Sequence, residues 1–249
     1  MSGENPSTDA AFLIDGCDTI PKLFLKKSVE RGDKVAMREK DFGIWQSYTW
    51  DDFRERAMEV AHGLLALGLR AGDVVSIQSE DCKEWVFADL GIMLCGGVVN
   101  GVYPTYQSNQ VSYTLNDSNC RFLFVEDEEQ LDKYLEVEAE LPNIERVIVF
   151  DWKGLRGLSH DKVMPIDRLY TLGQEYGRDH QGQVEDIVAQ GDAGDLAVQL
   201  LAPALEQRIV SCVLHQRMFE NVSRLGWRAS PECQARISEL TKNFIELGR

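Results

Sequence analysis

The chain has 249 residues, 44% hydrophobic and 27% charged, which is the composition of an ordinary globular protein. Its formal net charge of −15 repels phosphate backbones and anionic lipid headgroups, so we expect no nucleic-acid partner. No apolar run approaches the roughly 20 residues that span a bilayer, so we expect no transmembrane segment. The first residues also lack the basic and apolar regions of a signal peptide.

The first third of the chain contains clear signals for helix ends. Residues 1–18 are small and polar, which predicts a flexible leader. From Thr19 a helix is expected, with a proline near its start and a glycine after its end, followed by two strands around the turn KDFG. A second helix is expected between Thr49 and Gly68, where Asp52 can close a capping box with Thr49.

Apolar strands then alternate with helices. The strands GDVVSIQ, VVNGV, RFLFV and ERVIVF are separated by helical segments of 10 to 16 residues. This alternation predicts an α/β fold, with a layered parallel sheet flanked by helices. Residues 151–194 are polar and rich in glycine, which predicts a surface excursion with one helix near residues 165–176. Trp45, Trp50 and Trp85 are expected in the core or between subdomains rather than in a substrate site.

The character of the sequence changes near residue 198. DLAV resembles a buried strand, whereas QLLAPALEQR, which follows directly, has the pattern of a helix start. From Val198 onward there are seven basic and five acidic residues, against 26 and 41 in the whole chain. Leu205, Ile209 and Val213 have nearly helical spacing, and SPECQARISELTKNFIELGR predicts a second helix. We therefore expect residues 199–249 to form an α-helical C-terminal tail of unknown family.

Several origins for this tail remain open. Its two helices could form a hairpin that docks on an exposed sheet edge, or they could bind a partner helix. The tail could also begin an unrelated domain joined by gene rearrangement, or be the translation of an altered reading frame. The helical punctuation argues against a random frame.

The six cysteines are scattered, without a C-x-x-C pair. This distribution predicts reduced thiols and a cytoplasmic protein rather than a disulfide framework. Cys212 and His215 would share one face of a helix, but no second pair of ligands stands nearby, so we expect no metal site.

Three segments together resemble the adenylate-forming (AMP-binding) enzymes of the long-chain fatty acyl-CoA synthetase type. They are SYTWDDFRERAMEVAHGLLALGLRAGDVVSI, GIMLCGGVVNGVYPTYQSNQVSYTLNDSNCRFLFVED and EEQLDKYLEVEAELPNIERVIVFD. The resemblance covers residues 19–198 and implies part of the N-terminal domain of that family.

The resemblance also implies an activity and its requirements. Such enzymes convert a fatty acid and Mg-ATP to an acyl adenylate and pass the acyl group to coenzyme A. Their phosphate cradle is a Thr/Ser/Gly-rich loop ending Pro-Lys-Gly, directly after a strand that begins like GDLAV. This chain has no such loop after Val198. We therefore expect a truncated, ligase-like protein that is not catalytic alone, with no catalytic residue and no cofactor bound by this chain alone.

One loop is a candidate binding site by resemblance. Tyr103, Pro104 and Thr105 lie where relatives approach the nucleotide end of coenzyme A, although a simple strand-to-helix turn is the more expected role. A non-catalytic module that binds a lipid, coenzyme A or a full-length synthetase is the alternative to a truncated ligase. Self-association through open strand edges is also expected, and peripheral membrane contact stays open. An enzyme that regains its ATP site from another chain is the least expected.

Overall fold

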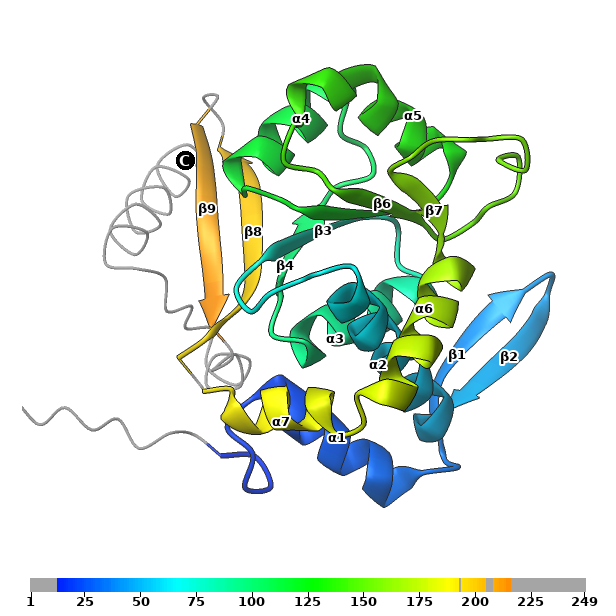
Figure 1. The fold of residues 1–249 in the computed structure, drawn as a ribbon, viewed down its shortest axis with the longest axis vertical. Coiled ribbons are helices and arrows are strands. Elements are labelled where there is room, and N and C mark those ends of the chain that lie inside the picture. The colour runs from blue at the N-terminus through cyan, green and yellow to red at the C-terminus, as the bar shows by residue number, and fades with distance from the viewer. Residues whose placement is uncertain (1–12, 193, 205–207, 216–249) are drawn as a thin grey trace, which may run out of the picture.

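The structure, a computed structural model, describes residues 13–192, 194–204 and 208–215 (Figure 1). The strands of these residues are β1 (Val35–Asp41), β2 (Ile44–Thr49), β3 (Val74–Gln78), β4 (Val98–Val102), β5 (Phe122–Val125), β6 (Arg146–Val149), β7 (Val163–Pro165), β8 (Leu196–Ala204) and β9 (Arg208–His215). The helices are α1 (Ile20–Arg31), α2 (Trp50–Ala66), α3 (Lys83–Leu94), α4 (Ser108–Asp117), α5 (Glu128–Val137), α6 (Ile166–Asp179) and α7 (Gln183–Gln190). A 3-10 turn, Glu138–Glu140, follows α5.

Strands β3 to β9 form one sheet in the order β7-β6-β5-β3-β4-β8-β9, while β1 and β2 form a separate antiparallel hairpin. Neighbouring strands from β7 to β8 run parallel, and β9 pairs antiparallel with β8. The predicted α/β architecture, a parallel sheet flanked by helices, is confirmed.

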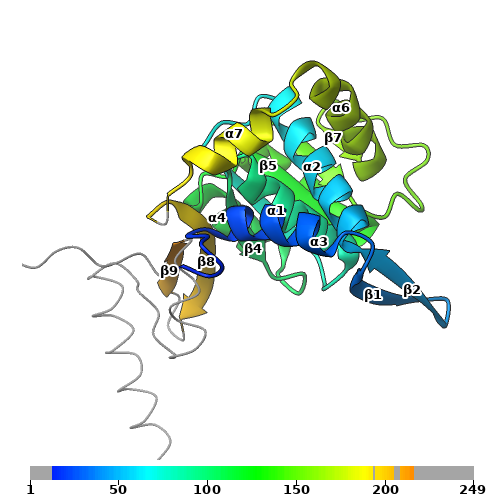
Figure 2. The same cartoon turned by 90° about the horizontal axis from the view of Figure 1, so that it is seen from below.

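Helices cover both faces of this sheet (Figures 1 and 2). Helices α1, α2, α3, α6 and α7 contribute to the first core cluster, and α4 and α5 contribute to the second. In β5, Phe122 and Phe124 belong to the first cluster, whereas Leu123 and Val125 belong to the second. Both faces of the strand are therefore buried, which explains its continuous apolar sequence.

The predicted helix ends are confirmed in α1 and α2. Thr19 Oγ1 accepts a hydrogen bond from Lys22 N at 3.4 Å. Thr49 Oγ1 accepts from Asp52 N at 3.1 Å, and Asp52 Oδ2 accepts in return from Thr49 N at 2.7 Å, so the capping box is complete. Gly68 follows α2 with φ +88°, a left-handed conformation that glycine adopts without steric cost.

Part of the predicted leader lies against α1. Lys22 Nζ donates to Asp18 Oδ1 at 2.9 Å, and Lys26 Nζ donates to the carbonyl of Asp15 at 2.6 Å. The lysines of α1 therefore anchor this turn of the chain. Residues 1–12, the rest of the predicted leader, lie outside the described residues.

Residues 151–194 are more ordered than the sequence predicted. The expected helix is present as α6, but β7 precedes it and α7 follows it. Val184 and Val188 of α7 are 0% and 6% exposed and pack in the first cluster. The excursion prediction was wrong here because the flanking glycines suggested a loop, whereas the apolar side chains cover the sheet.

The prediction of a helix from residue 199 is wrong for residues 199–204 and 208–215, which form β8 and β9. Strand β8 begins with the predicted DLAV segment and pairs with the open edge of β4, with Val198 opposite Val99. Pro203 has no backbone N–H to donate, which disfavours a helix at this position. In β8 a proline is tolerated there, because the pairing of β8 with β4 ends at Leu200. The β-branched residues of IVSCV also favour a strand.

The remaining predictions for the tail concern residues 205–207 and 216–249, which lie outside the described residues. Cys212 and His215 lie on β9, so the helical spacing considered for them does not apply. Trp50 and Trp85 pack against the first cluster as expected, but Trp45 is 64% exposed and is not a core residue.

Candidate functional site

The Tyr103-Pro104-Thr105 loop begins directly after β4, at the carboxyl end of the strand. The amide of Tyr106 donates to the carbonyl of Tyr103 at 3.1 Å, which closes a tight turn before α4. The rings of Tyr103 and Tyr106 are 5.4 Å apart between centroids, and the Tyr103 side chain is 59% exposed. The predicted turn is therefore present, and it presents an aromatic ring to solvent.

Lys133 of α5 holds this loop in place. Its Nζ donates to the carbonyl of Pro104 at 2.6 Å, to Gln130 Oε1 at 3.0 Å and to Glu129 Oε1 at 3.1 Å. These three acceptors match the three donors of an ammonium group. The loop is thus fixed to α5, a contact with Lys133 that the sequence of the loop itself does not predict.

The loop lies where the sheet opens. Strand β3 leads to α3 in the first cluster, whereas its neighbours β4 and β5 lead to α4 and α5 in the second. Adjacent strands therefore send their connections to opposite faces. Ligands of parallel α/β sheets bind at such positions, outside the carboxyl ends of the strands.

Polar groups gather beneath this edge. Asn100 Nδ2 donates to Ser76 Oγ at 2.8 Å, while Gln78 is 0% exposed and neither atom of its amide has a hydrogen-bond partner among the described residues. Glu126 Oε2 accepts from Glu80 N at 2.7 Å and so joins the ends of β3 and β5. Sequence reasoning missed these contacts, because they depend on which strands lie side by side.

The chemistry of this edge fits one part of coenzyme A better than another. The exposed Tyr103 ring can stack on an adenine. The phosphates fit less well, because Lys133 already has three acceptors and Glu80 and Glu126 add negative charge. The loop therefore suits a flat ring rather than an anionic group.

The residues of β8 and β9 do not fit a triphosphate cradle. Their ladder runs from Leu196 opposite His215 to Ala204 opposite Arg208, so the backbone amides along it serve the sheet. Both strands lack glycine and lysine. A phosphate cradle needs free N–H groups and a cation, and the described residues after Val198 supply neither a glycine-rich loop nor a lysine.

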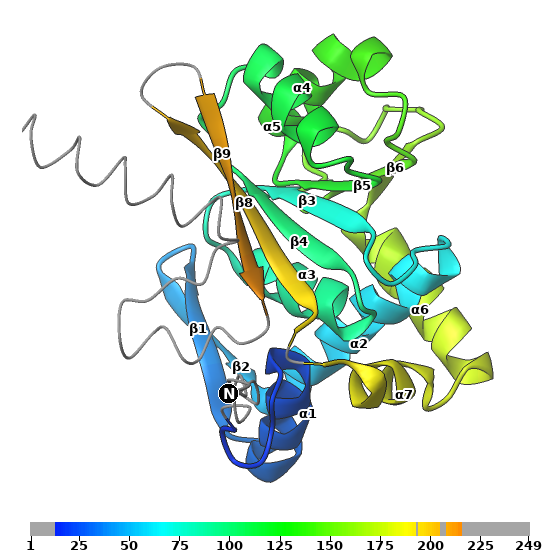
Figure 3. The ribbon, with the colours of Figure 1, turned by 90° about the vertical axis from the view of Figure 1, so that its left-hand side faces the viewer.

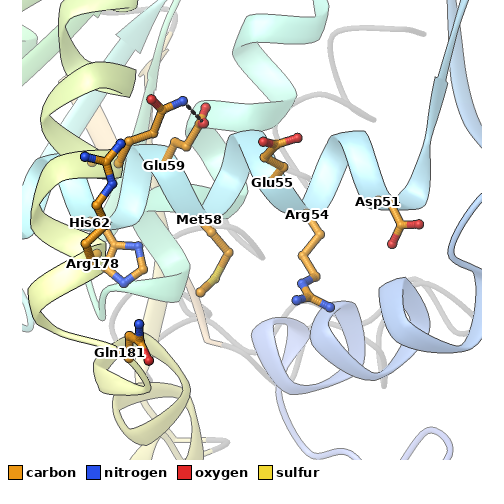
Figure 4. A pocket seen from close by; sticks show the side chains of 11 residues that line it. Asp51, Arg54, Glu55, Met58, Glu59, His62, Arg178 and Gln181 are labelled. Atoms are coloured by element: carbon orange, nitrogen blue, oxygen red, sulfur yellow. Dashed lines mark hydrogen bonds between the residues drawn. The ribbon is translucent and has the colours of Figure 1, made fainter.

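A separate groove of about 640 Å³ lies along α2 and α6 (Figure 4). Glu59 on its wall is 6% exposed, pairs with Arg56 at 2.5 Å and accepts from Gln174 Nε2 at 2.6 Å. His62 Nε2 is buried without a partner among the described residues, and burial lowers the pKa of this histidine. Both acidic and basic side chains line the groove, so it has no single charge preference.

The sequence also missed Asp89, which lies in α3. Burial raises the pKa of its carboxyl to about 7, although the side chain keeps partial exposure. A signal existed, because EWVFADLGIML is apolar except for its first residue and this one aspartate. Perturbed carboxyls mark functional sites or strained packing.

Within the described residues, no three His, Cys, Asp or Glu side chains are arranged to hold a metal ion. The helices of the described part include none that is long and apolar enough to cross a membrane.

Known proteins share both the sequence pattern and the fold. A family model described as AMP-binding enzyme matches residues 24–189. Over 157 residues the chain is 27% identical to long-chain-fatty-acid–CoA ligase ACSBG1 of Rattus norvegicus, covering 63% of this chain and 22% of the relative. Over 132 residues it is 30% identical to ACSBG2 of Xenopus laevis, covering 53% of this chain and 18% of the relative. The chain thus spans about a fifth of the length of these relatives.

Solved structures show the same fold. Anthranilate CoA ligase AuaEII, in complex with anthranoyl-AMP, aligns with a TM-score of 0.65 and 18% identity, over 83% of this chain and 36% of that chain. The luciferase-like enzyme of the mealworm Zophobas morio aligns with a TM-score of 0.67 and 17% identity, over 88% and 46% of the two chains. The match to the family model, together with these folds, leads to one conclusion: the chain belongs to the AMP-binding enzyme family.

Proposed function

We propose that this chain is a long-chain fatty acid–CoA ligase-like protein, of truncated form, that does not form acyl adenylates by itself. The family reaction joins a fatty acid to coenzyme A through an acyl adenylate at the expense of ATP. The curated relatives named as long-chain-fatty-acid–CoA ligases support the substrate class. The chain's place of action in this proposal is the cytoplasm.

The observation that carries the proposal is the β8–β9 hairpin. Strand β8 begins with the DLAV segment that precedes the phosphate loop in the family, but it continues to Ala204 and β9 begins at Arg208. Residues 205–207, Leu-Glu-Gln, are all that joins them. A triphosphate near −4 in charge needs several donors and cations, and an acidic three-residue connection has too few of them.

The test is acid-dependent exchange between ATP and pyrophosphate. We expect the purified 249-residue chain to show none with palmitate, whereas a full-length synthetase assayed in parallel exchanges readily. The proposal would be refuted if the exchange activity copurified with the chain through successive columns and mass spectrometry found no full-length enzyme in the sample.

A second candidate function, a non-catalytic module that binds coenzyme A, is favoured by the Tyr103 loop. Its exposed ring stands at the carboxyl edge of the sheet, where adenine has access. Pairing with a full-length synthetase or with a second copy is the accompanying partner proposal.

Calorimetric titration with coenzyme A tests this module. Tyr103→Ala should weaken binding about tenfold, the usual effect of losing one stacking ring. Tyr113→Ala removes a 49%-exposed tyrosine from the neighbouring α4 and serves as the matched control. Equal affinities of both variants and the unmodified chain would rule out the Tyr103 site.

A further inference from the structure

The β1–β2 hairpin projects from the body of the molecule (Figures 1 and 2). It forms its own two-stranded sheet and shares no backbone ladder with the main one. Its base is fixed by Met37 and Tyr48, which pack against the first cluster, and by an ion pair of 2.8 Å between Glu39 and Lys83. The distal half therefore extends into solvent.

Large apolar side chains crowd the distal end. Phe42 is 91% exposed, Ile44 is 65% exposed and Trp45 is 64% exposed. Phe42 and Gly43 form the two-residue turn with φ +45° and +83°. A left-handed conformation is unfavourable for phenylalanine, and glycine or asparagine is usual in such turns. Neither burial nor turn geometry therefore explains an aromatic residue at this position.

Two cations flank the indole on one face of the hairpin. Lys40 lies directly opposite Trp45 in the register, and Arg38 lies opposite Ser47, diagonal to Trp45. Cross-strand partners and their diagonal neighbours share a face. Both cations are exposed, and neither forms a salt bridge with a described residue. Glu39 alternates with them and so occupies a register position of the other face, where it pairs with Lys83.

We propose that the β1–β2 hairpin docks on an anionic lipid bilayer, with Phe42 and Ile44 entering the interface and Trp45 at headgroup level. Tryptophan prefers this level of a membrane, and nearby lysine and arginine are attracted to acidic headgroups. The inference does not depend on whether the chain forms acyl-CoA.

The size of the apolar tip favours a bilayer over a protein partner. Three side chains of this kind bury about 500 Å² at most. A stable protein–protein interface needs about 800 Å² from each partner. A bilayer sets no such minimum, because a few inserted side chains and two cations give reversible binding.

The negative charge of the whole chain does not prevent this docking. Four strand residues from Arg38 to the turn span about 13 Å. At physiological ionic strength, interactions between exposed charges are screened beyond about 8 Å. Lys40, the cation nearer the turn, therefore lies closest to the headgroups, while Arg38 and the acidic body lie farther back, where exposed charges are largely screened.

The experiment is co-sedimentation of the full chain with phosphatidylcholine vesicles that contain about a third phosphatidylserine, compared with phosphatidylcholine alone. We expect binding to the mixed vesicles that weakens at high salt. Phe42→Ser with Trp45→Ser should reduce binding more than about tenfold, and Arg38→Gln with Lys40→Gln should reduce it about tenfold. Brominated lipids should quench tryptophan fluorescence in the unmodified chain but not in Trp45→Phe.

Matched controls separate the hairpin from general effects. Val29→Ser changes a 69%-exposed apolar residue on α1, and Arg156→Gln with Arg168→Gln removes the same charge elsewhere. Both controls should bind like the unmodified chain, and thermal unfolding should show that all variants fold. Equal binding by all variants, or no binding to mixed vesicles, overturns the proposal. Dimers that the Phe42/Trp45 variant abolishes, without vesicle binding, would instead identify a second copy as the occupant.

Discussion

Two antiparallel hairpins of the described residues, β1–β2 and β8–β9, lie on opposite sides of the molecule (Figures 1 and 2) and differ in their surroundings, with β8 beside β4 (Figure 3). Strand β8 bonds to β4 and extends the main sheet, and Ala197 at its start is 0% exposed. The β1–β2 hairpin has no strand beside it and keeps an exposed apolar end. Two hairpins of similar local geometry thus have different roles: β8 joins the core because β4 lies beside it, whereas the β1–β2 hairpin stays an accessible surface.

The largest expected effect comes from Ala197→Asp. A carboxylate at this buried position would lose its hydration, so the free energy of unfolding should fall by about 3 kcal/mol or more. Trp45→Ser on the other hairpin should change it by less than about 0.5 kcal/mol. Urea denaturation measures both.

Ala71→Asp, at an exposed position, controls for the added charge. If Ala197→Asp were as stable as this control, β8 would not belong to the core, and the contrast between the hairpins would fail.

An intermediate effect is expected at Asp89 of α3, the helix that pairs with the β1–β2 hairpin through Lys83. Burial raises its pKa to about 7 in the folded state, from 3.8. The folded chain therefore holds a proton that the unfolded chain releases between these values, so this group lowers stability as pH rises from about 4 to about 7. Asp89→Asn should raise the free energy of unfolding at pH 8 by about 2 kcal/mol and flatten its pH profile.

Unfolding curves at pH 5 and pH 8 measure this effect. Asp132→Asn replaces an exposed aspartate in the middle of α5 and should leave the pH profile unchanged. If the free energy of unfolding changed with pH in the same way in Asp89→Asn and the unmodified chain, the Asp89 carboxyl would be hydrated rather than buried.

The smallest expected effect concerns the ion pair at the base of the β1–β2 hairpin. The side chains of Lys83 and Glu39 are 28% and 30% exposed, so Glu39→Gln should cost only about 0.5 kcal/mol. The difference should vanish near 1 M salt. In Glu39→Gln, faster amide hydrogen exchange in β1 and β2 with no change in β8 would show that the ion pair acts locally. Equally faster exchange in β8 would contradict this.

The sequence predicted most of the body but not its last strands. Helix α2 was found from its own cap, Thr49, and its own stop, Gly68, which are local signals. Strand β9 was missed because the four-residue spacing of Ile209 and Val213 fits a helix as well as a strand. The choice depends on pairing with β8, which itself pairs with the open edge of β4, far away in the chain. The Tyr103 turn was likewise local and was predicted, whereas Lys133 and Gln78 reach that site through the strand order β5-β3-β4.

The pairing of β8 with β4 also sets the order of events while the protein is being made. Val99 meets Val198 across about a hundred residues, so β4 leaves the ribosome long before its outer partner is translated. During that interval the nascent chain presents an unpaired strand edge, which is a known starting point for aggregation. Slow translation between β4 and β8 would prolong this exposure, so chaperone demand should be greatest in the middle of synthesis.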